Sequence, residues 1–152
     1  MAKQRITISA IHKVSKSIPE SLIIDEYIKR IPWGVAIKQL DSKLKLPAKQ
    51  QQESEGELLL KSIPSGSFII AMDERGSKFT SQEFSSYIQK KISQPISFII
   101  GGAHGLSEEV RDKSDFLLSL SDMTMPHLLA RAMLVEQIYR AYTISQNHPY
   151  HK

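Results

Sequence analysis

The sequence predicts an α/β fold, with a mainly parallel sheet and helices on both of its faces, in one domain that spans residues 1–152. Short runs typical of β-strands alternate with amphipathic segments along the chain, as in consecutive β-α-β units. Two of these runs, SFIIAMD (67–73) and ISFIIGG (96–102), are continuously apolar, as strands are when both faces of a parallel sheet are covered. No internal repeat or long linker divides the chain.

The first half of the chain is expected to hold two strands and two helices. RITISAI (5–11) alternates in polarity like a strand, and residues 33–40 do so again. Ser17 is the expected N-cap of the helix between them, with Pro19 and Glu20 in its first turn. Residues 41–54 are rich in Lys and Gln and predict a surface loop that runs into a helix ending near 60–63. The apolar face of the first helix is predicted to consist of Leu22, Ile23, Tyr27, Ile28 and Ile31.

The second half continues the alternation. Thr80 with Glu83 three residues later is the pattern of a capping box, for a helix that runs through residue 92. Ser107 is the expected cap of a short helix, and residues 116–120 predict the last strand. A final helix is expected over residues 126–145, with Thr124 as its cap. Its apolar face is predicted to consist of Leu128, Leu129, Ala132, Val135, Tyr139 and Tyr142.

Composition excludes several classes of protein. The chain has no cysteine, which excludes disulfides, thiolate metal sites and a cysteine nucleophile. It has no apolar run near 18 residues and no signal-peptide pattern, so we expect a cytoplasmic protein without a membrane span. Its net charge of +4 arises in residues 1–66, which hold 11 basic and 7 acidic groups. Such an excess favours RNA as a partner, although a solvated lysine-rich face has the same composition.

Three loops follow the predicted buried strands, at the edge where ligands of open α/β sheets bind. They are residues 72–76 (MDERG), 101–106 (GGAHGL) and 120–125 (LSDMTM). Glycines at 101, 102 and 105 allow a close approach of backbone to a ligand, or simply a tight turn. The loop matches neither the dinucleotide fingerprint G-x-G-x-x-G nor a P-loop, so it does not by itself predict a nucleotide phosphate site.

The chain stops at His148-Pro149-Tyr150-His151-Lys152. An aromatic ring, a group that titrates near neutrality and a cation are the components that hold a nucleobase by stacking and a phosphate by charge. A frayed terminus is the alternative interpretation. His127, in the first turn of the final helix, is a candidate for either a structural or a catalytic role.

Three segments of the chain, FIIGGAHGLSEEV, SLSDMTMPHLLARAMLVEQIYRA and NHPYHK, together resemble the ribosomal large subunit methyltransferase H family, small members of the SPOUT class of knotted methyltransferases. The resemblance implies a C-terminal deep trefoil knot and a homodimer. It also implies transfer of a methyl group from S-adenosylmethionine to N3 of pseudouridine 1915 in 23S rRNA, with the assembled ribosome as the expected substrate. No metal ion is expected.

The resemblance also implies roles for individual residues. Cofactor contacts fall on Met72, Gly101, Leu120, Ser121, Asp122, Met123, Thr124 and Met125. His151 and Tyr150 are the candidates for handling the N3 proton, with Arg140 and His127 as supporting groups. The tail is expected to complete the site of a partner subunit.

One position departs from the family, which usually has an acidic residue where this chain has His104. Two alternatives therefore stay open. One is a related SPOUT enzyme that acts on another nucleotide of rRNA or tRNA. The other is a ribosome-binding assembly factor without turnover, which the basic first half and the altered His104 would suit.

Overall fold

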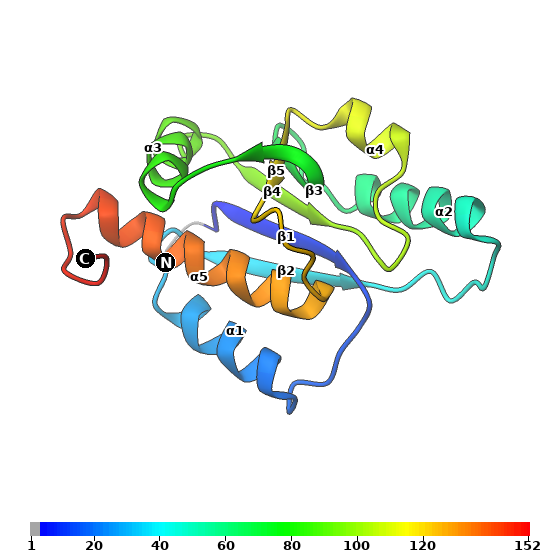
Figure 1. Cartoon of the computed structure of the whole chain (residues 1–152), viewed down its shortest axis with the longest axis horizontal. Coiled ribbons are helices and arrows are strands. Elements are labelled where there is room, and N and C mark those ends of the chain that lie inside the picture. The colour runs from blue at the N-terminus through cyan, green and yellow to red at the C-terminus, as the bar shows by residue number, and fades with distance from the viewer. Residues whose placement is uncertain (1–3) are drawn as a thin grey trace.

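A computed structural model describes residues 4–152. Five strands form one sheet in the order β2-β1-β4-β3-β5, and every neighbouring pair is parallel. This arrangement confirms the predicted parallel sheet, whose carboxyl edge lies at the right of Figure 1. The strands are β1 (Ile6–Ile11), β2 (Val35–Leu40), β3 (Phe68–Lys78), β4 (Ile96–Ile100) and β5 (Phe116–Ser119).

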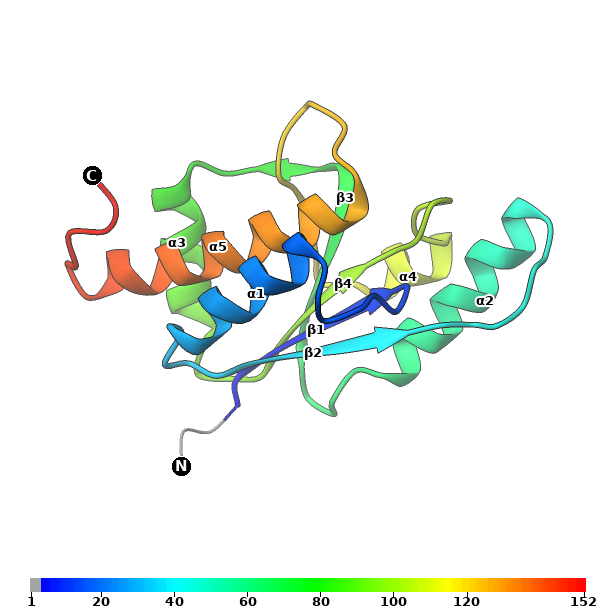
Figure 2. The same ribbon diagram turned by 90° about the horizontal axis from the view of Figure 1, so that it is seen from below.

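Helices cover both faces of the sheet, as predicted (Figures 1 and 2). On one face α5 lies between α1 and α3, over a core that includes Ile8, Phe98 and Ile138. On the other face α2 and α4 pack over a smaller core that includes Leu59 and Val110. The helices are α1 (Pro19–Lys29), α2 (Ala48–Lys61), α3 (Ser81–Lys91), α4 (Glu108–Lys113) and α5 (His127–Ser145).

Two of the four expected helix caps are present. Thr80 Oγ1 accepts from the backbone N–H of Glu83, whose side chain accepts from the Thr80 backbone in return, so the capping box is confirmed. Ser107 caps α4 by accepting from the N–H of Val110. The cap expected at Ser17 is wrong, because α1 starts one residue later and the Ser17 hydroxyl pairs with Ser15.

The cap expected at Thr124 is also wrong. Pro126 occupies the N-cap position of α5, and no side chain caps this helix. Since α5 begins at His127, Thr124 lies two residues outside the cap and is exposed in the turn that precedes the helix.

The predicted apolar faces are partly wrong. Ile24 is the buried residue of α1, whereas Leu22 and Ile23 are 59% and 46% exposed. On α5, Leu129 is 46% exposed, while the fully buried positions include Leu134 and Ile138. These two helices therefore carry apolar side chains on surfaces that the fold of one chain leaves uncovered.

Two boundaries also differ from the prediction. Helix α2 begins at Ala48, so the second half of the expected loop is helical. Strand β3 runs to Lys78, because its pairing with β5 shifts register between Met72 and Ser77 and then resumes. Within residues 4–152, no helix is long and apolar enough to cross a membrane.

Candidate active site

A cavity of about 200 Å³ opens at the carboxyl ends of β4 and β5, beside Met72, Asp73 and Glu74 of β3. This is the edge where an open parallel sheet binds its ligands. Three segments form most of its wall: β3 around Met72, the glycine loop (residues 101–106) and the 119–126 turn. The structure thus brings together all eight residues assigned to the cofactor, namely Met72, Gly101, Leu120, Ser121, Asp122, Met123, Thr124 and Met125.

Backbone geometry explains why the loop after β4 is rich in glycine. Gly102 and Gly105 form a β-bridge, and the N–H of Gly105 donates to the carbonyl of Gly102 at 3.0 Å. Gly105 has φ +76°, a conformation that side chains disfavour. A Cβ on Gly101 would lie 2.9 Å from the carbonyl oxygen of Gly105. The loop is therefore compact, and it presents backbone to the cavity.

Side chains of helix α2 contact the glycine loop and hold it in place. The side-chain amide of Gln52 donates to the carbonyl of His104 at 2.7 Å. The buried carboxylate of Glu55 lies so close to Gly102 that a Cβ there would meet its Oε1 at 2.9 Å. The His104 side chain itself is exposed, so the loop is held through its backbone at this position.

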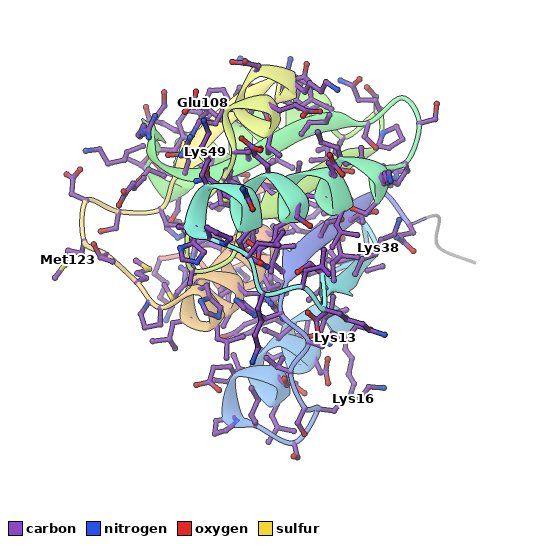
Figure 3. All side chains as sticks on the ribbon, turned by 90° about the vertical axis from the view of Figure 1, so that its right-hand side faces the viewer. Lys13, Lys16, Lys38, Lys49, Glu108 and Met123 are labelled. Carbon is purple, nitrogen blue, oxygen red and sulfur yellow. The ribbon has the colours of Figure 1, made fainter. Side chains whose placement is uncertain are left out.

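Short-range hydrogen bonds shape the 119–126 turn. The hydroxyl of Ser119 donates to the carbonyl of Ser121, and the hydroxyl of Ser121 accepts from the N–H of Met123, both at 3.0 Å. Asp122 pairs with Lys78 at the end of β3. Met123 is 79% exposed at the tip of the turn (Figure 3). The hydroxyls therefore stabilise the turn locally, the ion pair of Asp122 with Lys78 joins it to β3, and its apolar tip is exposed.

His127 lines the cavity from the first turn of α5. Its ring stacks on that of His12, which directly follows β1, with centroids 4.7 Å apart. Burial lowers the pKa of His127, and the nearby His12 and Arg131 lower it further. His12 is not among the residues predicted from sequence, although its position directly after β1 places it at the same carboxyl edge as the predicted loops.

The residues predicted to be catalytic meet at the other end of α5. Arg140 Nη1 lies 3.0 Å from Nδ1 of His151, and its guanidinium lies over the ring of Tyr150. The Tyr150 hydroxyl donates to Glu136 at 2.9 Å and lies 3.2 Å from the hydroxyl of Tyr27. Burial, together with these hydrogen bonds, raises the pKa of Tyr150. Its hydroxyl is consequently a neutral donor and a poor base.

Within one chain, the cavity and the tail do not meet. His127 and Arg140 are 13 positions apart on α5, which at ~1.5 Å per residue is about 20 Å. Figure 1 shows the C-terminus beyond the far end of α5 from the 119–126 turn. The structure therefore unites the predicted cofactor residues in one cluster and the predicted catalytic residues in another. Nowhere in residues 4–152 do three His, Asp or Glu side chains form a group that could hold a metal ion.

Comparison with known sequences gives close matches over nearly the whole chain. Residues 4–151 match the family model described as "Predicted SPOUT methyltransferase". The ribosomal RNA large subunit methyltransferase H of Paramagnetospirillum magneticum is 37% identical over 151 residues, which cover 97% of this chain and 99% of the relative. The protein of the same name from Rhodospirillum centenum is 39% identical over 137 residues, which cover 88% of this chain and 90% of the relative.

Solved structures share the fold at low sequence identity. A probable methylase family protein from Haemophilus influenzae aligns with a TM-score of 0.59 and 14% identity, over 95% of this chain and 67% of that one. The A. aeolicus TrmH/SpoU tRNA modifying enzyme aligns with a TM-score of 0.54 and 13% identity, over 99% of this chain and 82% of that one.

These matches confirm the α/β fold of the SPOUT class, to which the C-terminal trefoil knot belongs. The expected resemblance to the large subunit methyltransferase H proteins is confirmed as well, because the relatives are similar over nearly their full length. The chain therefore belongs to the SPOUT methyltransferase family and, within it, to the family of the ribosomal RNA large subunit methyltransferase H proteins.

Proposed function

We propose that this chain transfers a methyl group from S-adenosylmethionine to N3 of pseudouridine 1915 in 23S rRNA of the large ribosomal subunit. The observation that carries the proposal is the cavity, which gathers every residue expected to contact the cofactor. Family membership supports the same reaction. Because the substrate is ribosomal RNA, we place the protein in the cytoplasm.

The residues around the cavity fit S-adenosylmethionine. Its wall combines the backbone of the glycine loop with apolar side chains such as Met72, Leu120 and Met125, and this combination suits an adenine ring and a thioether chain. A Cβ on Gly105 would have no neighbouring atom within 4 Å. The bound cofactor supplies a methyl group already activated by its sulfonium. The protein therefore has to align the acceptor nitrogen and remove its proton.

A homodimer would bring the two clusters of site residues together. The tail lies about 20 Å from the cavity of its own chain, by the helical rise between His127 and Arg140. A second copy could cover exposed apolar side chains of α1, the 119–126 turn and α5; they are Leu22, Ile23, Met123, Leu129 and Met133. We infer that His151, Tyr150 and Arg140 of one subunit act beside the cavity of the other. In this arrangement Tyr150 positions the target base by stacking or donation, since its hydroxyl is a poor base.

Exposed lysines surround the same edge of the sheet and suit the phosphates of RNA. Lys13 and Lys16 follow β1, and Lys49 lies in the first turn of α2. Figure 3 shows these three side chains on the face that also carries Met123. Among the salt bridges of residues 4–152, none involves these lysines. Phosphate contacts from such groups give affinity and position without base specificity.

Methyl transfer to purified substrates tests the proposal. The protein is incubated with methyl-labelled S-adenosylmethionine and either large subunits, whole ribosomes or free 23S rRNA. All substrates come from cells that lack the protein. We expect one methyl group per particle, at N3 of pseudouridine 1915, and faster transfer to assembled ribosomes than to free RNA. Methylation of another nucleotide would overturn the assignment, and cofactor binding without transfer would favour an assembly factor.

A further inference from the structure

Two imidazole rings meet beside the cavity. The rings of His12 and His127 are inclined by only 26°, with centroids 4.7 Å apart, so they stack face to face. His127 lines the cavity, and His12 packs against it from the end of β1. Nε2 of His12 is buried, and within residues 4–152 it has no hydrogen-bond partner. Stacking is therefore the main contact through which the His12 ring acts.

The backbone at His12 is strained. Its φ is +83°, a value that glycine adopts freely and that costs free energy in other residues. Arg131 fixes this conformation, because Nη2 of its buried guanidinium donates to the carbonyls of Ile11 and His12 at 3.2 and 3.3 Å. Strained residues that the surrounding structure holds in place concentrate at functional sites. A histidine at a position whose positive φ favours glycine thus indicates a role for the imidazole ring.

The surroundings of His127 favour the neutral form of its imidazole. Burial, His12 and Arg131 all lower its pKa. The carboxylates on the cavity wall do little to oppose this effect, because Asp73 pairs with Arg111 and Asp122 pairs with Lys78. Glu74, the third carboxylate of the wall, is exposed to solvent. His127 is therefore a neutral base that faces the cavity at physiological pH.

Building on the proposed methyl transfer, we propose that His127 accepts the N3 proton of the target pseudouridine and that His12 is its positioning residue. The N3–H bond breaks, and its electron pair stays on N3. As N3 bonds to the methyl carbon, the carbon–sulfur bond breaks and its electron pair stays on sulfur. The proton forms an N–H bond with the free nitrogen of the imidazole. The imidazolium then returns this proton to water. His12 holds the ring in orientation by stacking. Burial, together with His12 and Arg131, favours the neutral form of His127 before the transfer.

This assignment differs from the sequence-based one, which placed proton transfer on His151 or Tyr150. The Tyr150 hydroxyl donates a hydrogen bond to Glu136, and its raised pKa keeps it protonated, so it cannot take up the N3 proton. His151 already has one ring nitrogen against the guanidinium of Arg140. His127 is the histidine that the cavity of the same chain contains. The tail then binds and positions the base, and α5 supplies the group that takes the proton.

Titration of His127 in the protein without substrate tests the role of His12. We compare wild type with His12→Ala and His12→Gly by following the imidazole C–H signals with NMR across pH. In both variants the pKa of His127 should rise toward its ordinary value, while His104→Gln should leave it unchanged. His12→Gly should melt about 2–4 °C above His12→Ala, because glycine relieves the backbone strain. An unchanged His127 pKa in both His12 variants would overturn the positioning role.

Single-turnover methylation of ribosomes tests the proton transfer itself. The wild-type rate should rise with pH and level off, with a midpoint at the His127 pKa measured by NMR. His127→Gln should slow transfer by ~10²–10⁴-fold with cofactor affinity within about twofold of wild type. Both His12 variants should move the midpoint upward. A wild-type rate in His127→Gln would overturn the proposal. If the wild-type protein methylates no RNA, the proposed function itself falls, whereas the titration still reports on the histidine pair.

Discussion

Arg131 is a buried residue of α5 that contacts the ends of the first two strands. Its side chain is 2% exposed, and burial lowers its pKa. Within residues 4–152 it forms no salt bridge, and it donates instead to Gln39 Oε1 and to the carbonyls of Ile11 and His12. These hydrogen bonds from Nη1 and Nη2 tie α5 to the carboxyl ends of β1 and β2, whereas the buried Nε has no hydrogen-bond partner within residues 4–152. The same positive charge adds to the effects of burial and of His12, which lower the pKa of His127.

The lowered pKa of His127 makes stability depend on pH. Between the ordinary histidine value of 6.5 and the lower value in the folded protein, the unfolded chain binds more protons. Stability contributed by neutral His127 is therefore complete above pH 6.5 and declines as the pH falls through its folded pKa. Urea unfolding at pH 7.5 and pH 5.5 should show this loss, and His127→Gln should show a smaller one. Equal losses in the two proteins would contradict the assignment.

The elements of the fold were largely predictable, and the errors have physical causes. The apolar runs of β3 and β4 and the capping box of α3 depend on local sequence, and these predictions are confirmed. The predicted apolar faces of α1 and α5 are wrong at Leu22, Ile23 and Leu129, which are exposed. Periodicity shows that a helix has apolar residues, but it cannot distinguish a surface that packs on the sheet from one that remains free for another molecule.

Only the part of the site that lies at the ends of the strands could be predicted from the sequence. Of the three loops expected at the carboxyl edge, residues 101–106 and 120–125 contribute to one cavity. The loop expected at residues 72–76 is wrong, because this segment belongs to strand β3, although Met72, Asp73 and Glu74 do line the cavity. Long-range contacts could not be predicted from local sequence. His12 stacks on His127, which is 115 positions away, and Gln52 donates to the loop carbonyl of His104. The sequence pattern also did not indicate the distance between the tail and the cavity, since the two lie at opposite ends of the same helix.

At the scale of an element, the glycine loop gives a prediction with a matched control. Gly105 and Gly66 have φ of +76° and +77°, and a Cβ on either would meet nothing within 4 Å. Gly105→Ala and Gly66→Ala should each cost ~1–2 kcal/mol of unfolding free energy in urea. Only Gly105→Ala should weaken S-adenosylmethionine binding in calorimetry, since Gly66 precedes β3 at the other edge. Equal affinities would remove the loop from the cofactor site.

At the scale of the whole molecule, the proposed shared site predicts complementation between two inactive proteins. Gly101→Val damages the cavity and keeps the tail, whereas truncation after Asn147 removes the tail and should keep cofactor affinity. Neither should methylate ribosomes alone. After subunit exchange of an equal mixture, half of the dimers are mixed, each with one intact site, so about a quarter of wild-type activity should return. No recovery would show that the tail serves its own chain.

The lysine-bearing face predicts how binding to the ribosome responds to salt. Lys13→Gln with Lys16→Gln should weaken binding and reduce the slope of log affinity against log salt by ~0.7–0.9 for each phosphate that the variant no longer neutralises. Lys61→Gln with Lys90→Gln is the matched control, because these exposed lysines end α2 and α3, away from the cavity. A filter-binding series over salt concentration measures both slopes. Indistinguishable slopes would exclude this face from the RNA interface.

Mass mapping of 23S rRNA from cells that lack the protein shows whether the chain methylates N3 of pseudouridine 1915. We predict that the fragment containing this nucleotide loses the mass of one methyl group. The wild-type gene should restore that mass, and the gene truncated after Asn147 should not. A methyl group that persists at this nucleotide in the deletion strain would contradict the claim.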